Sequence, residues 1–259
     1  MTQTTETILG FKVDSRSMDD CINEMSIWIN KGHLCRWFAC LNPHSYVVSL
    51  NDKNFSKALK DADWVVPDGV GIVIASRFLG GKIKKRITGH DIFSEIHRKL
   101  NQKKGAKVFF IGSTEETLKN IRARMGRDYP NIRVVGTYSP PYKPIYTAKE
   151  LNTMIQAINI KKPDVLWVGM TAPKQEKWIY ENKHRLKVKF AGAVGAVFDF
   201  YTGNVKRAHP VYRKLGLEWF IRLVREPRRV WRRTFISAPI FLWRLLLARF
   251  YNLKEKSSP

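Results

Sequence analysis

The chain has 259 residues, with 46 Lys and Arg against 22 Asp and Glu, so its formal net charge is +24. That length suffices for one large α/β domain, or for a core with an appendage, without disulfide or metal staples. Three cysteines without metal-type spacing indicate a reducing compartment rather than a disulfide framework. The excess positive charge predicts an anionic partner: nucleic acid, an anionic membrane surface or a phosphorylated substrate.

Neither end of the chain predicts a targeting or membrane-spanning segment. The first 20 residues are polar and contain acids, unlike a signal peptide. No run of about 20 uncharged apolar residues occurs, so we expect no ordinary transmembrane helix.

Helix and strand signals alternate along the first 202 residues. Strands are predicted over residues 37–41, 64–66, 107–111, 132–137, 165–169 and 189–194. Helices are predicted over residues 17–30, 45–51, 55–62, 69–79, 91–101, 115–125, 148–159 and 175–186. This alternation predicts an α/β fold with a mostly parallel, Rossmann-like sheet covered by helices on both faces. We expect a core over 1–202, in two halves of about 1–104 and 105–202, and a basic appendage over 203–259.

Asp68 is the most informative acidic residue. It follows an apolar strand, within Pro67-Asp68-Gly69, and therefore lies at the carboxyl end of that strand, where open α/β sheets bind ligands. A carboxylate beside a helix start that favours phosphate suits a sugar-nucleotide transferase. The alternative is an ordinary turn, for which Pro-Asp-Gly is a common sequence.

Three further strand ends carry candidate ligand contacts. Asn42 precedes a proline, where its amide could hold a hydroxyl group or simply begin a turn. Gly112 and Ser113 open a helix whose free N–H groups suit a diphosphate, or Ser113 is only a helix cap. Lys174 and Gln175 open another helix and could contact phosphate or base, although Pro173 and Glu176 also make an ordinary helix start.

The sequence offers little sign of a metal site. Asp61-Ala62-Asp63 matches a short acid-x-acid pattern, but it falls at a predicted helix end, where solvated acids are common. The six histidines have no ligand spacing. The run from Pro140 to Pro144 is either a lid over a ligand or a proline-stiffened connection.

The tail combines basic and apolar residues at helical spacing. Its basic stripe consists of Arg222, Arg225, Arg229, Arg232 and Arg233. Aromatic and aliphatic residues dominate 235–251, with Arg244 and Arg249 between them. This pattern is typical of a helix that lies on a membrane surface. The alternative is a helix packed on the core with a solvated basic face.

Several of these stretches together resemble the WecG/TagA/CpsF family of bacterial glycosyltransferases. The matching segments, in the order of the family, are Asn42-Pro43, residues 62–71 around Asp68, Arg86-Ile87-Thr88-Gly89-His90-Asp91, Pro173-Lys174-Gln175-Glu176, residues 192–200 including Asp199, Gly203-Asn204-Val205-Lys206-Arg207-Ala208, residues 217–222 and Glu226-Pro227-Arg228-Arg229. Each segment is a weak signal alone, and together they span nearly the whole chain.

The resemblance implies a GT-E type core and a metal-independent, inverting transfer of a sugar from a UDP-sugar to a polyprenyl-diphosphate-linked saccharide, in bacterial surface polysaccharide synthesis. It implies that Asp68 is the base, that Asn42 and Gln175 contact the nucleotide-sugar, and that Arg207, Arg222 and Arg229 act from the appendage. It also implies a peripheral location on the cytoplasmic face of the plasma membrane and, in many members, self-association.

The full candidate site follows from the motifs and the resemblance together. Asp68, Arg222, Arg225 and Arg229 are the expected catalytic residues. The expected substrate contacts are Asn42, Cys40, Thr88, Asp91, Gly112, Ser113, Lys174, Gln175, Asp199 and Arg207. No cofactor or metal is expected.

Three segments depart from the pattern of the family, one of them Arg207-Ala208-His209-Pro210, where Arg-Ala-Pro is more usual. Cys40 stands where many members have Thr, and His44 stands where many have Glu. Both lie near the presumed sugar pocket and leave the donor sugar open. A different hypothesis, a basic membrane or nucleic-acid-binding protein without catalysis, rests on charge alone, and no recognised nucleic-acid-binding motif accompanies it. We therefore expect no nucleic-acid partner.

Overall fold

The computed structural model describes the backbone of residues 4–205, 220, 223–224 and 227–257, and the side chains of these residues except 228–229 and 251–257. Its centre is one six-stranded sheet with the order β4-β3-β8-β7-β5-β6, and every neighbouring pair is parallel. The strands are β3 (Arg36–Leu41), β4 (Trp64–Pro67), β5 (Lys107–Gly112), β6 (Arg133–Tyr138), β7 (Val165–Gly169) and β8 (Phe190–Ala193). The mostly parallel α/β core predicted from the sequence is confirmed.

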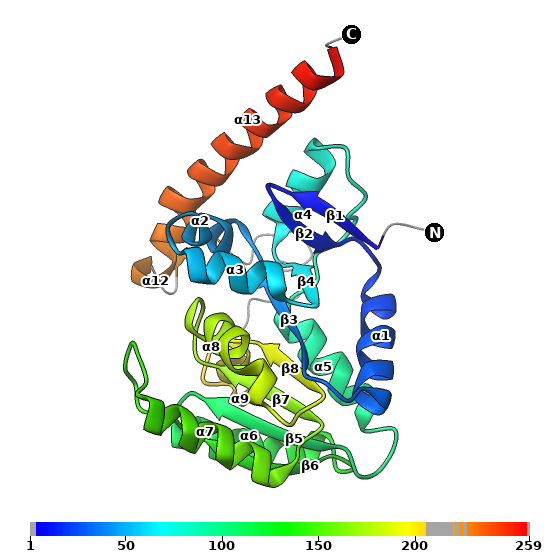
Figure 1. Cartoon of the computed structure of the whole chain (residues 1–259), viewed down its shortest axis with the longest axis vertical. Helices are drawn as coiled ribbons and strands as arrows, with labels where there is room; N and C mark the ends of the chain where they lie inside the picture. Colours follow the sequence, from blue (N-terminus) through cyan, green and yellow to red (C-terminus); the bar gives the residue numbers. More distant parts are fainter. Residues whose placement is uncertain (1–3, 206–219, 221–222, 225–226, 258–259) are drawn as a thin grey trace.

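Helices cover both faces of this sheet (Figure 1). One face packs on α2 (Pro43–Asn51), α3 (Lys53–Asp61), α7 (Ala148–Lys161) and α8 (Lys174–Asn182), which is followed by the short helix η1 (Lys183–Arg185). The other face packs on α1 (Met18–Lys31), α5 (Gly89–Leu100), α6 (Glu115–Asp128) and α9 (Val197–Thr202). Neighbouring strand residues alternate between the two cores, as Trp37 and Phe38 do, because successive side chains of a strand point to opposite faces.

A two-stranded antiparallel hairpin, β1 (Thr5–Ile8) and β2 (Phe11–Asp14), precedes the sheet and was not predicted. Its turn consists of Leu9 and Gly10, both with positive φ, as a tight two-residue turn requires. Ile8, Phe11 and Val13 are buried against α4 (Val70–Phe78) and the adjacent core. The short helix α9 was also not predicted, since six residues are too few for a clear helical period.

The described part of the appendage is helical and lies against α2. It consists of α12 (Pro227–Trp231), the π-helical segment η2 (Arg232–Ser237) and α13 (Ala238–Ser257). Phe241 and Leu245 of α13 are buried, and the Phe241 ring meets the Tyr46 ring of α2 edge-on at 5.5 Å between centroids. The far end of α13 extends beyond the sheet (Figure 1). None of the described helices carries an apolar stretch long enough to cross a bilayer.

Candidate active site

Because all six strands are parallel, their carboxyl ends lie at one edge of the sheet, which is where ligands bind in open α/β folds. This edge carries Asn42 after β3, Asp68 after β4, Ser113 after β5 and Gln175 shortly after β7. The loop after β5 leads to β6 on one side, and the loop after β7 leads to β8 on the other. The two loops diverge there, as they do at the ligand-binding switch point of doubly wound sheets.

Asp68 and Asn42 form the best-defined pair at this edge. Nδ2 of Asn42 donates a hydrogen bond of 3.2 Å to Oδ2 of Asp68. Oδ1 of Asn42 accepts from the backbone N–H of Ser45 and so caps α2, while the backbone N–H of Asp68 donates to the Leu41 carbonyl. The amide of Asn42 is therefore held by the helix and the carboxylate by the strand, and the amide orients the half-buried carboxylate.

Cys40 lies behind this pair and beside the first turn of α5. Its sulfur is 3.5 Å from the point where a side chain on Gly89 would begin. Burial raises the pKa of the Cys40 thiol well above its usual range, and the negative charges of Asp68 and Glu176 raise this pKa further. The thiol is therefore neutral at physiological pH and contributes a small, weakly polar surface.

Thr88 and Asp91 cap α5 reciprocally. The Thr88 hydroxyl accepts from the Asp91 N–H, and Oδ2 of Asp91 accepts both from the Thr88 backbone N–H at 3.0 Å and from its hydroxyl at 2.8 Å. These bonds give both side chains a structural task at the helix start. Their placement beside Gly89 and Cys40 also puts this helix start next to the Asn42–Asp68 pair.

Gly112 and Ser113 form a tight turn between β5 and α6. Gly112 has φ of 109°, and a Cβ there would lie 2.4 Å from the Gly169 carbonyl oxygen, so only glycine fits. Ser113 also has positive φ, and its carbonyl accepts from the Ser139 hydroxyl. The cap of α6 is Thr114, not Ser113, because the Thr114 hydroxyl accepts from the Thr117 N–H.

Lys174 lies against the proline-rich connection after β6. Its ammonium donates to the Lys143 carbonyl and lies 4.0 Å from the centroid of the Tyr146 ring. Burial, followed by the charge of Lys143, lowers the pKa of Lys174. Lys174 thus joins the start of α8 to the segment predicted as a lid or a stiff connection.

Gln175 and Glu176 are buried together at the start of α8, with exposed fractions of 4% and 3%. Nε2 of Gln175 donates to Oε1 of Glu176 at 2.9 Å, while Oε1 of Gln175 and Oε2 of Glu176 are buried with no hydrogen-bond partner in the described part of the chain. Burial raises the pKa of Glu176 to about 7, and the bond from Gln175 partly opposes this rise. Sequence reasoning treated Glu176 only as part of a helix start.

Asp199 lies in the first turn of α9, after β8, and its backbone carbonyl accepts from the Val205 N–H. The other expected residues of the appendage lie outside the described residues: Arg207, Arg222 and Arg225 entirely, and Arg229 in its side chain. Their predicted roles stay predictions.

The described residues of the appendage place Arg233 near the edge. Nδ1 of His44 lies 2.8 Å from the Ser237 hydroxyl, which joins α2 to η2. Burial and then the positive charge of Arg233 lower the pKa of His44 to about 4, so that His44 is neutral at pH 7. His44 lies two residues after Asn42. Arg233 belonged to the predicted basic stripe, but sequence reasoning favoured other arginines for the site.

The acid-x-acid residues lie at the opposite edge of the sheet and are partnered. Asp61 pairs with Lys183 at 2.6 Å, and Asp63 accepts from the Trp37 N–H and pairs with Arg36. Among the residues that the structure describes, no three His, Cys, Asp or Glu side chains gather as a metal site would require. Metal independence stays a prediction.

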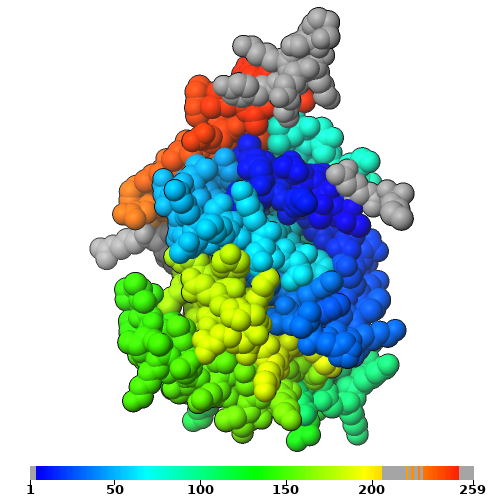
Figure 2. Space-filling model, viewed as in Figure 1, coloured from blue at the N-terminus to red at the C-terminus, as the bar shows by residue number. Residues whose placement is uncertain are grey.

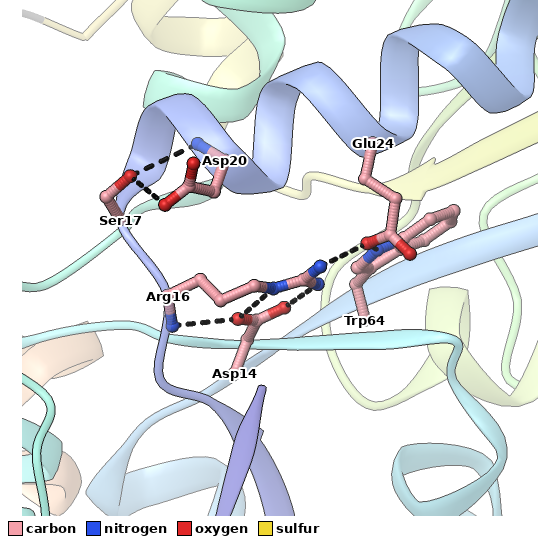
Figure 3. A network of polar contacts seen from close by, with 6 residues as sticks. All are labelled: Asp14, Arg16, Ser17, Asp20, Glu24 and Trp64. Atoms are coloured by element: carbon pink, nitrogen blue, oxygen red, sulfur yellow. Dashed lines mark hydrogen bonds and ion pairs between the residues drawn. The ribbon is translucent and has the colours of Figure 1, made fainter. Parts of the chain in front are cut away.

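A cavity of about 570 Å³ also lies at the opposite edge, between the β1–β2 hairpin, α1 and the starts of β3 and β4. Part of its charged lining is internally paired. Arg16 contacts both Asp14 and Glu24 at 2.6 Å, and Glu24 accepts from the Trp64 indole (Figure 3). Because this cavity lies at the amino ends of the strands, we place the active site at the carboxyl edge instead.

Comparison with known proteins identifies the family to which this chain belongs. The family model described as "Glycosyl transferase WecG/TagA/CpsF family" matches residues 6–255. The chain belongs to this family. The resemblance found in the motifs is thereby confirmed over nearly the full length.

Three curated relatives share one enzyme name, N-acetylglucosaminyldiphosphoundecaprenol N-acetyl-beta-D-mannosaminyltransferase. The relative from Bacillus subtilis (strain 168) is 31% identical over 221 residues, which cover 83% of each chain. The relative from Bacillus spizizenii is 32% identical over 217 residues, which are 84% of this chain and 80% of the relative. The relative from Staphylococcus aureus (strain MW2) is 28% identical over 250 residues, which are 96% and 95% of the two chains. The present chain is a glycosyltransferase of the hexosyltransferase class.

Proposed function

We propose that this enzyme transfers N-acetylmannosamine from its UDP-sugar to an N-acetylglucosaminyl diphosphate carried on a polyprenol, with inversion at the anomeric carbon. The names of the relatives support the sugar and the acceptor. The pairing of Asp68 with Asn42 at the carboxyl edge carries the chemistry, because it presents an oriented carboxylate where an α/β sheet binds ligands.

In the proposed reaction, Asp68 accepts the proton of the acceptor hydroxyl as its oxygen attacks the anomeric carbon. The bond between this carbon and the UDP oxygen breaks in the same displacement, and a single displacement inverts the configuration. The departing diphosphate gains negative charge, which N–H groups at helix starts of the carboxyl edge and arginines of the appendage stabilise. Arg222, Arg225 and Arg229 are the proposed arginines.

Turnover of purified protein with a panel of UDP-sugars tests this proposal. The acceptor is a synthetic N-acetylglucosaminyl diphosphate lipid, and the donors are UDP-N-acetylmannosamine, its uronic acid, UDP-N-acetylglucosamine and UDP-glucose. We expect UDP-N-acetylmannosamine to give the highest kcat/KM and the largest rise in Tm, since a ligand that binds only the folded state stabilises it. A preference for another donor would contradict the proposed sugar, while sugar transfer to the acceptor would still support the transferase reaction. The proposal would be contradicted if the protein transferred sugar from none of the donors, or only hydrolysed them.

We also propose that the appendage docks on the anionic cytoplasmic face of the plasma membrane. α13 buries Phe241 and Leu245 on the core, yet it exposes a second apolar set on its other faces: Ile240, Leu242, Trp243, Leu246 and Phe250. Arg244 and Arg249 lie among these residues. An exposed apolar surface with Trp and basic residues is typical of a helix at a lipid interface.

Replacing both Leu242 and Leu246 by Glu is expected to lower partitioning onto anionic vesicles by more than tenfold, because burying one Leu side chain contributes about 1.5–3 kcal/mol. Flotation with phosphatidylglycerol vesicles measures the bound fraction. The matched control replaces Leu34 and Ile160, exposed apolar residues outside the appendage, by Glu and should float as the wild type does. Equal flotation of the α13 variant and the control would remove α13 as the docking element.

A further inference from the structure

α4 differs from the other core helices in exposing a continuous apolar face. Val70, Ile74 and Phe78 are 38%, 51% and 40% exposed, while Ile72, Val73 and Ala75 are buried on the opposite face. Residues four apart lie on one side of a helix, so the three exposed side chains form one row along the whole of α4. A helix that is apolar all round is normally buried, and an exposed apolar row of this kind marks a binding surface.

One end of this row lies at the proposed active site. α4 begins at Val70, two residues after Asp68, through Gly69, whose φ of 85° requires glycine. Gly71 approaches α2 so closely that a Cβ there would lie 2.4 Å from Cγ of Pro43. The start of α4 is therefore fixed beside Asn42 and Asp68.

The other end of the row lies at the appendage. The guanidinium of Arg249 in α13 is 6.0 Å from the centroid of the Phe78 ring. In Figure 2 the red atoms of α13 lie next to the teal atoms of the α4 region. The exposed apolar row on α4 thus leads from the proposed base to the helix whose exposed apolar residues we assign to the membrane.

The charges around the far end fit the anionic surface of a bilayer. Arg77 is in the last turn of α4, and Lys82, Lys84 and Lys85 follow it, all exposed. Such a basic border attracts the anionic headgroups of a bilayer, while the apolar row takes the hydrocarbon of the acceptor.

We propose that the exposed face of α4, lined by Val70, Ile74 and Phe78, binds the first isoprene units of the acceptor's polyprenyl chain. The inference rests on the proposed function, since it needs a prenyl diphosphate acceptor whose sugar lies at Asp68. The chain then runs along α4 from the diphosphate towards α13 and the bilayer. The nine residues of α4 give this track a length of ~13 Å at about 1.5 Å per residue.

Chain-length dependence in solution tests this site apart from membrane docking. The acceptors are N-acetylglucosaminyl diphosphates of prenyl alcohols with one, two, three and four isoprene units, in buffer without vesicles or detergent. We expect kcat/KM of the wild type to rise about tenfold or more from one to three isoprene units, because each added unit buries hydrocarbon on α4. The value should level off once the prenyl chain is longer than α4.

The variant Ile74→Glu should lower the ratio of kcat/KM between the three-unit and one-unit acceptors towards one. Since Ile74 is half exposed, the variant should keep the fold, and Ile74→Gln provides a second, uncharged test. The matched control Ile27→Glu changes an exposed isoleucine of α1 and should keep the ratio of the wild type.

Three results would overturn the inference. The first is equal kcat/KM for all chain lengths in the wild type, with sugar transfer intact, and the second is an unchanged ratio in both Ile74 variants. The third is a change of oligomeric state in Ile74→Glu, seen by sedimentation, with an unchanged ratio, which would assign the row to contact between copies of the chain. If no acceptor of any length is glycosylated, the proposed function falls, and this inference falls with it.

Discussion

Asp68→Asn is expected to lower kcat by about two orders of magnitude or more while leaving the KM for the donor nearly unchanged. A positioned base contributes roughly 10²–10⁴-fold to a proton transfer, and an amide cannot accept the proton of the acceptor hydroxyl. The new side chain still has an oxygen that can accept the hydrogen bond from Nδ2 of Asn42, so the edge between β3 and β4 should keep its geometry. Steady-state kinetics with the best donor, together with donor binding by calorimetry, measure both effects.

Asp61→Asn is the matched control for this substitution. It makes the same chemical change at the end of α3, where Asp61 pairs with Lys183 at the opposite edge of the sheet, and it should retain turnover. Retained turnover in Asp68→Asn would show that another group takes the proton. Loss of donor binding together with turnover would assign Asp68 to binding instead of catalysis.

Glu176→Gln is expected to reduce the dependence of folding stability on pH. Burial holds the pKa of Glu176 at about 7 in the folded protein, above the usual 4.5. Its contribution is therefore fully present below about pH 4.5 and is lost as pH rises to about 7, because only the unfolded chain ionises freely in that range. At about 1.4 kcal/mol for each pH unit, the difference between the two pKa values corresponds to a loss of ~3 kcal/mol.

Urea unfolding at pH 5 and pH 8 measures this effect. The free energy of unfolding should fall by ~2–3 kcal/mol less in Glu176→Gln than in the wild type over this interval. The glutamine keeps an oxygen for the bond from Gln175, so packing changes little. Glu181→Gln, at an exposed position of the same helix, should match the wild type. Identical pH profiles for Glu176→Gln and the wild type would mean that Glu176 ionises freely within the fold.

The parts of the fold that the sequence predicted are those with strong local signals. The strands from Trp37, Trp64, Lys107 and Val165 are short apolar runs that end in Gly, Pro or Asn, and they lie where the pattern placed them. Helix starts were equally readable: Ser17 caps α1, as expected. Elements too short for a clear period were not predicted. These are the β1–β2 hairpin, whose strands have four residues each, and α9.

The candidate site was predictable only as a set of strand ends. Asp68 and Asn42 each follow a strand, and a parallel sheet brings such positions to one edge, but their direct hydrogen bond depends on β3 and β4 being neighbours. The raised pKa of Glu176 depends on burial, which the sequence does not show for a residue beside Lys177. The contact between His44 and Ser237 joins positions 193 residues apart and has no local signal at all.

One nine-residue helix links the two ends of the proposed machinery. α2 begins directly after its capping residue, Asn42. Its His44 contacts Ser237, and its Tyr46 packs against Phe241. A short α-helix has a regular and rigid geometry, and this geometry sets the distance between the Asp68 carboxylate and the appendage. For an enzyme held at a bilayer by that appendage, the reaction takes place at a constant height above the lipid. With the acceptor proposed above, the encounter between enzyme and substrate would then be a two-dimensional search within the plane of the leaflet.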